Sequence, residues 1–131
     1  MQNPDYANPP SLLLTVESML DSLDPDHPDE IDKTLKFFEF AFPRLQAWYN
    51  WFNTTQIGPV PGSYRWRGRN ETTDRELNPK TLTSGLDDYP RASHPSSDER
   101  HVDLYCWMAY ASGVLARVAE EVGENPTIYR K

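Results

Sequence analysis

A single long stripe of apolar residues is the feature that most limits what this chain can fold into. Between positions 29 and 54, large apolar side chains recur at alternating steps of four and three, the spacing of one helix face. The stripe consists of Ile31, Leu35, Phe38, Phe42, Leu45, Tyr49 and Phe52. It predicts a helix from Asp29 to Thr54. Pro43 inside it predicts a kink, because proline removes one backbone hydrogen bond.

A shorter helical pattern precedes this stripe. It predicts a helix from Ser11 to Leu23, with the Ser11 hydroxyl capping the first turn. The segment 24–28 contains two prolines, which disfavour helical geometry in the residues ahead of them and predict a turn. The expected apolar positions are Leu12, Val16, Met19, Leu20 and Leu23.

A third helix is predicted from Ser96 to Val122. Ser96 and Glu99 have the S-x-x-E spacing of a capping box, and Gly123 is a suitable terminating residue. Its expected apolar face, small enough for another helix to approach closely, is Val102, Cys106, Ala109, Gly113, Ala116 and Val118.

Helical periodicity disappears between residues 58 and 95. Turn formers, charges and aromatic residues replace it, and a connection of this length is rare in a compact domain unless it is functional or disordered. The aromatic content is untypical of disorder, so an ordered functional loop is expected, with a short strand or two between Gly62 and Arg67. Three long helices, this loop and no convincing strand run predict an all-α fold.

Charge and composition exclude several function classes. The formal net charge is −7 with basic and acidic residues interleaved, which argues against a nucleic-acid partner. The single cysteine excludes an internal disulfide, and three histidines give no zinc spacing. No apolar stretch approaches the roughly 20 residues of a bilayer span, and the polar amino terminus resembles no signal peptide.

The densest acidic cluster outside the helical patterns is Asp87-Asp88-Tyr89-Pro90-Arg91. Two adjacent carboxylates in a loop can occupy different environments, one buried and protonated and the other paired with Arg91. Such a separation is what acid catalysis requires. A solvated Asp-Asp turn before a proline is the alternative.

A second cluster combines Glu99, Asp103 and Trp107, which recur every four residues and would share one helix face. Paired carboxylates accept sugar hydroxyls and an indole covers the apolar face of a pyranose. Glu99 has an alternative role in the capping box. Asp103 could instead pair with Arg100 or face solvent.

A third cluster, residues 64–69, alternates aromatic and basic side chains and includes Trp66 and Arg67. This pattern suits an anion, a nucleic-acid strand, a saccharide, or arginines stacked on tryptophan at a surface. The negative net charge disfavours the nucleic-acid interpretation.

Three segments closely resemble the processing α-glucosidases of glycoside hydrolase family 63. They are Trp66-Arg67-Gly68-Arg69, the run from Glu76 to Pro95 that contains Ser84-Gly85-Leu86-Asp87-Asp88-Tyr89-Pro90-Arg91, and Glu99-Arg100-His101-Val102-Asp103-Leu104-Tyr105-Cys106-Trp107. Similar residues before and after the long apolar stripe extend the resemblance over nearly the whole chain.

The resemblance implies part of an (α/α)6 barrel catalytic domain that works by inversion. It implies removal of the terminal α-1,2-linked glucose from the triglucosylated N-glycan precursor on nascent glycoproteins, in the lumen of the endoplasmic reticulum, without a metal or organic cofactor. Asp87 matches the general acid of the family. The residues expected to bind substrate are Trp66, Arg67, Asp88, Tyr89, Arg91, Glu99, Asp103 and Trp107.

The family's general base is expected to lie outside this sequence. Glu120, Glu121 and Glu124 match no motif of the family, and three helices cannot close a barrel that uses twelve. Residues 1–131 are therefore expected to be an incomplete portion of the catalytic domain, without the signal and membrane anchor of the parent protein, and inactive alone. The alternative is a saccharide-binding remnant or an inactive fragment.

Overall fold

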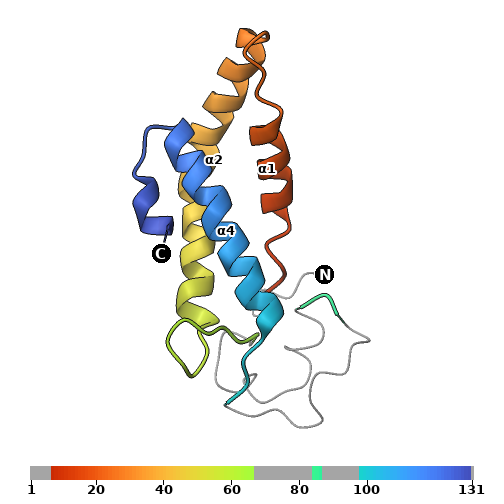
Figure 1. The fold of residues 1–131 in the computed structure, drawn as a ribbon, viewed down its shortest axis with the longest axis vertical. Coiled ribbons are helices and arrows are strands. Elements are labelled where there is room, and N and C mark those ends of the chain that lie inside the picture. The colour runs from red at the N-terminus through yellow and green to blue at the C-terminus, as the bar shows by residue number, and fades with distance from the viewer. Residues whose placement is uncertain (1–6, 67–83, 87–97, 131) are drawn as a thin grey trace. The chain divides into compact units, whose positions relative to one another are not determined.

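The chain divides into two compact units. The computed structural model describes residues 7–66, 84–86 and 98–130. Met1–Pro9 with Asn50–Met108 form the first unit, called the loop unit here, and Pro10–Tyr49 with Ala109–Lys131 form the second, called the helical unit. The helices are α1 (Leu12–Asp21), α2 (Pro28–Thr55) and α4 (Val102–Glu121), followed by the 3-10 helix η2 (Pro126–Tyr129) (Figure 1). The described residues are predominantly helical, which confirms the all-α class.

Helix α1 begins and ends close to its predicted limits, and Val16, Met19, Leu20 and Leu23 face or contact the core as predicted. Leu13, Val16 and Leu20 are its buried residues, whereas Leu12 is 66% exposed, so the prediction that Leu12 lies on the apolar face was wrong. The prediction of a cap was also wrong, because the Ser11 side chain makes no capping hydrogen bond. Ser11 has helical backbone angles, and a side-chain cap requires an extended residue at this position.

The long stripe predicted from the sequence is confirmed in α2. Phe38, Phe42 and Phe52 are buried, and the helix runs without interruption through Pro43. Asp29 and Glu30 lie in its first turn, where negative charge is favourable. The predicted kink at Pro43 stays a prediction.

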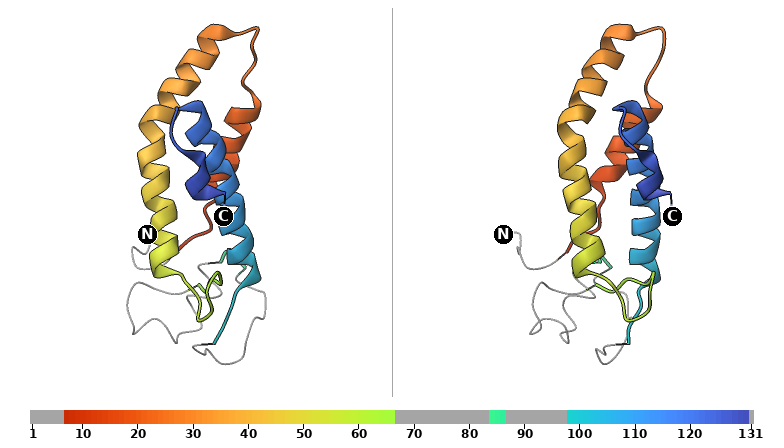
Figure 2. Two further views of the ribbon diagram at one scale, coloured as in Figure 1. Left: turned by 60° about the vertical axis from the view of Figure 1, so that its left-hand side comes forward. Right: turned by 90° about the vertical axis from the view of Figure 1, so that its left-hand side faces the viewer.

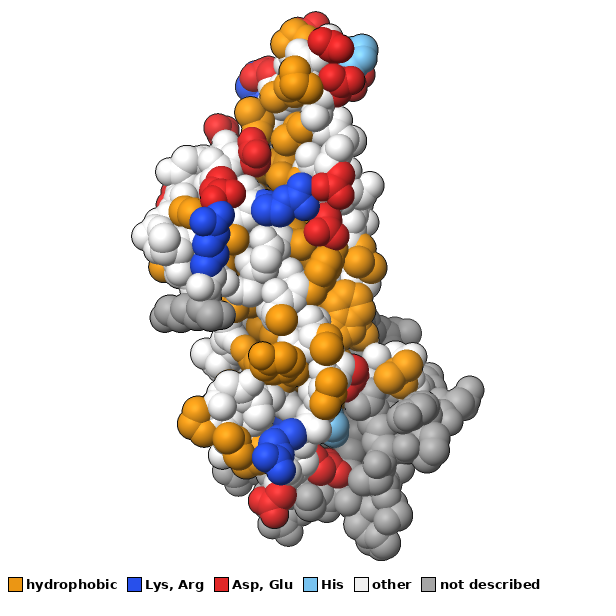
Figure 3. Space-filling view, viewed as in Figure 1, with side chains coloured by type: hydrophobic (Ala, Val, Ile, Leu, Met, Phe, Trp, Pro, Cys, Tyr) orange, Lys and Arg blue, Asp and Glu red, His pale blue; other side chains and the backbone are white. Residues whose placement is uncertain are grey.

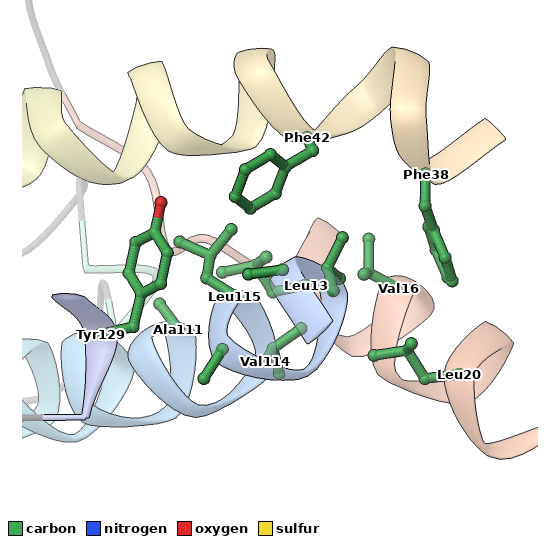
Figure 4. Packing of buried hydrophobic residues seen from close by; sticks show 12 residues of the cluster. Leu13, Val16, Leu20, Phe38, Phe42, Ala111, Val114, Leu115 and Tyr129 are labelled. Atoms are coloured by element: carbon green, nitrogen blue, oxygen red, sulfur yellow. The ribbon is translucent and has the colours of Figure 1, made fainter. Parts of the chain in front are cut away.

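The core of the helical unit joins α1, the first part of α2, the last part of α4 and η2. Figure 2 shows α1 and α4 beside α2 from two directions. In Figure 4, Phe38 and Phe42 project from α2 toward Leu13, Val16 and Leu115. Tyr129 of η2 completes the cluster, with its ring edge-on to Phe42 at 6.3 Å between centroids. Each large side chain buried this way contributes about 1.5–3 kcal/mol.

Helix α4 ends as the sequence predicts but begins later. The amide of Glu124 donates to Ala119 O and that of Gly123 to Glu120 O, a Schellman ending that Gly123 permits with its φ of 72°. The predicted start at Ser96 with a capping box through Glu99 was wrong, because the helix begins at Val102.

The apolar face predicted for this third helix is confirmed at Ala116 and Val118, which are buried, but was wrong at its first four positions. Val102 is 75% exposed, Cys106 is exposed, and Gly113 has open space beside it rather than a neighbouring helix. The buried positions are Leu104, Met108, Ala111, Val114, Leu115, Ala116, Val118 and Ala119. The predicted set mixes positions from both sides of the helix, whereas burial follows one stripe that contains small and large apolar residues alike.

Charged side chains of both signs lie on the outside of the helical unit. Arg117 of α4 pairs with Glu17 at 3.4 Å and Asp21 at 2.5 Å on α1. Figure 3 shows one face of the molecule, on which acidic and basic side chains lie close together. Within the described ranges, no helix has the length and apolarity needed to cross a bilayer.

Candidate functional site

The loop unit contains a short turn that follows α2. Ile57 and Tyr64 form an isolated antiparallel bridge, and the amide of Gly58 donates to Ser63 O at 2.7 Å. Gly62 has a positive φ of 77°, which glycine adopts without steric cost. Among the described residues, this bridge takes the place of the short strands predicted between Gly62 and Arg67.

Backbone and side-chain hydrogen bonds hold the segment 64–66 against the end of α2. The amide of Arg65 donates to Gln56 O at 2.8 Å, and the Tyr64 hydroxyl donates to Asn53 Oδ1 at 2.6 Å. Gln56 and Arg65 are both buried. The segment therefore enters the site with its position fixed.

Trp66 lies at the centre of the described part of the site. Its ring is 1% exposed and packs edge-on against Phe52, with 6.3 Å between centroids. The indole Nε1 donates to Asp103 Oδ2 at 2.8 Å, and the Trp66 amide donates to His101 Nδ1 at 2.9 Å. Trp66 thus connects the loop segment to His101, which directly precedes α4, and to Asp103 in the first turn of α4.

His101 is the residue immediately before α4. Its own amide donates to Tyr64 O at 2.8 Å, and its carbonyl accepts from the amide of Tyr105 at 3.1 Å. These contacts explain why α4 does not begin at Ser96: the amide that an earlier helix would need is bound to the loop segment instead. A nonlocal contact here overrides the local capping signal.

The later start of α4 changes how the predicted carboxylates are arranged. Glu99 precedes the helix, so the prediction that Glu99, Asp103 and Trp107 share one helix face holds only for the last two. The Glu99 side chain is 12% exposed, and its Oε2 lies 3.9 Å from His101 Nε2. Asp103 occupies the first turn of α4, where the positive end of the helix dipole favours a carboxylate.

This arrangement is suited to holding a polyhydroxylated ligand. The Asp103 carboxylate accepts from the Trp66 indole, and an ionised carboxylate has about four lone-pair sites in all. Trp107 lies one helical turn further and is half-buried. A fixed carboxylate and an amphipathic ring on neighbouring turns are the elements that orient a sugar.

The predicted general acid Asp87 and the predicted contacts Arg67, Asp88, Tyr89 and Arg91 lie outside the described residues. The described segment 84–86 directly precedes Asp87. Ser84 is buried and its Oγ accepts from the amide of Leu86 at 3.2 Å.

A glycine is required within this short turn. Gly85 has a φ of 73°, a backbone conformation that residues with a Cβ rarely adopt. Across the described ranges, no three His, Cys, Asp or Glu side chains are grouped in a way that could hold a metal ion.

Two residues of this site were not predicted as site residues. Gln56 lies one residue beyond α2, and His101 stands in a segment that resembles the family but has no role assigned from the sequence. Both act through backbone groups of the 64–66 segment, to which they are not adjacent in sequence. No periodic pattern marks such a contact.

Comparison with known proteins assigns the chain to a family. Residues 1–131 match the model of the glycosyl hydrolase family 63 C-terminal domain. Alpha-glucosidase 2 of Arabidopsis thaliana is 51% identical over 127 residues, covering 95% of this chain and 16% of that protein. A mannosyl-oligosaccharide glucosidase of the same plant is 49% identical over 133 residues, covering 100% of this chain and 16% of that protein.

A more distant relative shows the same pattern of coverage. A probable mannosyl-oligosaccharide glucosidase of Schizosaccharomyces pombe is 34% identical over 161 residues, covering 95% of this chain and 19% of that protein. The chain thus spans less than a fifth of the length of each of these three relatives. With a family match along its whole length, the chain belongs to glycosyl hydrolase family 63.

Proposed function

We propose that this chain supplies part of the active site of an inverting α-glucosidase that removes the terminal α-1,2-linked glucose from the triglucosylated N-glycan precursor. The observation that carries the proposal is the family match over residues 1–131, with a relative named mannosyl-oligosaccharide glucosidase at 49% identity. The substrate is the N-linked oligosaccharide of nascent glycoproteins in the lumen of the endoplasmic reticulum. The catalytic domain is an (α/α)6 barrel to which α1, α2 and α4 contribute.

In this proposal Asp87 is the general acid and protonates the departing glycosidic oxygen. Its neutral form must persist near neutral pH, which requires an environment that raises its pKa. The reaction uses no metal or organic cofactor. The turn formed by Ser84, Gly85 and Leu86 is the described segment that directly precedes Asp87 in the sequence.

Glucose binding is assigned to the described part of the site. Asp103 and Glu99 accept sugar hydroxyls, Trp107 covers an apolar face of the ring, and Trp66 contributes by fixing Asp103 through its indole nitrogen. The hydrogen bond between Trp66 and Asp103 supports this assignment, because it leaves the carboxylate oriented before the sugar arrives. The other proposed contacts are Arg67, Asp88, Tyr89 and Arg91.

An inverting glycosidase also needs a carboxylate base about 6.5–9.5 Å from the acid, with an attacking water between them. We place this base in a part of the catalytic domain outside residues 1–131. A polypeptide of these residues alone is therefore expected to release no glucose. The alternative function, saccharide binding without turnover, is what such a polypeptide would retain.

The experiment is hydrolysis of the triglucosylated glycan by the complete protein and by its Asp87→Asn variant. General acid catalysis contributes about a hundredfold to ten-thousandfold, so kcat should fall by at least a hundredfold while KM changes little. The matched control is Asp26→Asn, which makes the same chemical change at an exposed carboxylate between α1 and α2. Asp87→Asn activity equal to that of the control would remove Asp87 from the role of acid.

The 131-residue polypeptide provides the second arm of this experiment. Its incubation with the same glycan, followed by glucose detection, separates the two functions. Release of glucose would place the base within residues 1–131. Retention of intact glycan with measurable binding would support the proposed division of the active site.

A further inference from the structure

His101 has two ring nitrogens in different environments. Nδ1 accepts the amide hydrogen of Trp66 at 2.9 Å, whereas Nε2 faces Glu99 Oε2 at 3.9 Å. The residue is 8% exposed, so its ring is held inside the loop unit rather than at its surface. One ring nitrogen of His101 is therefore fixed by a hydrogen bond, and the other lies near a carboxylate.

The backbone donor determines which tautomer His101 adopts. An imidazole nitrogen that accepts a hydrogen bond carries no proton, so in the neutral ring the proton belongs to Nε2. Glu99 Oε2 is a carboxylate oxygen near that nitrogen. The separation of 3.9 Å is an electrostatic contact rather than a short hydrogen bond.

Trp66 connects His101 to Asp103, the second carboxylate of the site. Its amide is bound to His101 and its indole to Asp103, and these two residues are separated by Val102 alone. His101, Trp66 and Asp103 therefore form a closed ring of contacts at the start of α4. The amide of His101, which donates to Tyr64 O at 2.8 Å, attaches the same residue to the loop a second time.

We propose that His101 is a positioning residue that sets both carboxylates assigned to glucose. Through Nδ1 it fixes Trp66, whose indole orients Asp103, and through Nε2 it faces Glu99. His101 itself does not contact the sugar. This inference rests on the proposed function, because it assumes that Asp103 and Glu99 bind the substrate.

Two substitutions separate the two nitrogens in the complete protein. His101→Asn keeps an acceptor near the position of Nδ1 but cannot reach Glu99, whereas His101→Gln places an amide near the position of Nε2 without the Nδ1 acceptor. Hydrolysis of the triglucosylated glycan is measured for both variants beside the wild type, together with the thermal midpoint of each.

The two variants are expected to differ in KM. His101→Gln should raise KM about tenfold with kcat changed less than about threefold, since misplaced binding groups weaken substrate contacts. His101→Asn loses only the 3.9 Å contact with Glu99 and should raise KM by a smaller factor, about threefold. Equal effects of the two variants on KM, or effects that follow only their thermal midpoints, would overturn the role of Nδ1.

The connection through Trp66 is tested by a double variant. Trp66→Phe keeps an aromatic ring but removes the donor to Asp103, so it should raise KM as His101→Gln does. If both act through Asp103, the KM of the double variant should be no higher than that of the more impaired single variant. Independent effects on KM would instead multiply. Multiplied effects would refute the shared path. A wild type that releases no glucose would instead refute the proposed function, and the inference with it.

Discussion

Tyr110 shows how a single side chain of the helical unit responds to its surroundings. Its hydroxyl donates to Glu17 Oε2 at 2.6 Å, which connects α4 to α1. Burial, followed by the bond to the negative Glu17, raises the pKa of Tyr110 to about 12. Both causes favour the neutral phenol in the folded chain.

The raised pKa predicts a loss of stability in alkaline solution. The folded state holds the phenol proton more tightly than the unfolded state, so this contribution is fully present below pH 10 and is lost as the pH rises toward about 12. Tyr110→Phe should reduce this loss and lower the free energy of unfolding at pH 7 by about 1.5–3 kcal/mol. Urea denaturation at pH 7 and at several values from 9 to 12 measures both effects.

Tyr129 also contributes to the loss of stability in alkaline solution, because burial raises the pKa of its hydroxyl. Part of the alkaline loss should therefore remain in Tyr110→Phe. The matched control is Tyr105→Phe, since the Tyr105 side chain is exposed. A Tyr110→Phe variant with the full alkaline loss of the wild type would disprove the contribution of Tyr110.

At the scale of elements, two glycines have opposite surroundings. A Cβ at Gly58 would lie 3.1 Å from the backbone carbonyl carbon of Ser63, in the turn between Ile57 and Tyr64. A Cβ at Gly113, inside α4, would meet no atom within 4 Å. The first glycine permits a close approach, whereas the second only weakens a helix.

Alanine at these positions should therefore change stability in opposite directions. Gly58→Ala is expected to destabilise the chain by about 1–3 kcal/mol, because the turn must open to admit a methyl group. Gly113→Ala should stabilise it by about 0.5–1 kcal/mol, the usual gain of alanine over glycine in a helix. Urea midpoints of the two variants measured side by side test the pair, and a stabilising Gly58→Ala would contradict the described turn.

The elements also show what the sequence could predict. The stripe of α2 was correct because it contains seven large apolar residues at regular spacing, a signal that depends only on local order. The end of α4 was correct because Gly123 has a local steric role. The start of α4 was wrong because it depends on the contacts of His101 with Tyr64 and Trp66, which are distant in sequence.

In the candidate site, too, features set by local spacing were predictable from the sequence, and features set by nonlocal contacts were not. Asp103 and Trp107 share a helix as expected, since a spacing of four places residues on one face. The burial of Trp66 and its bond to Asp103 could not be predicted, because an alternating aromatic and basic pattern suits a surface and an interior equally. The roles of Asp87, Asp88, Tyr89, Arg67 and Arg91 stay predictions.

At the scale of the whole molecule, apolar side chains remain on the outside of the helical unit. Leu12 and Leu14 of α1 are 66% and 51% exposed, and Phe37 and Phe40 of α2 are also exposed. One face of the Phe40 ring is covered by the Arg44 guanidinium, whose Cζ lies 3.9 Å from the ring centroid. Exposed apolar groups of this number are typical of surfaces that contact other chain segments.

The 131-residue polypeptide is therefore expected to bind a hydrophobic dye such as anilinonaphthalene sulfonate. Replacing Leu12 and Leu14 with lysine should reduce dye fluorescence about twofold or more, since apolar area is lost and charge is gained. The matched control replaces Thr15 and Ser18, two exposed polar residues of α1, with lysine. Equal fluorescence from the two double variants would show that the leucines are not the binding surface.

The two bonds of Trp66 have a consequence for saturation mutagenesis. Every replacement except proline keeps the main-chain donor to His101 but removes the indole, which donates to Asp103 and packs against Phe52. A scan of position 66 will thus report the combined loss of this packing and of the bond to Asp103, and will conceal the main-chain contact with His101. Proline alone also lacks the amide hydrogen.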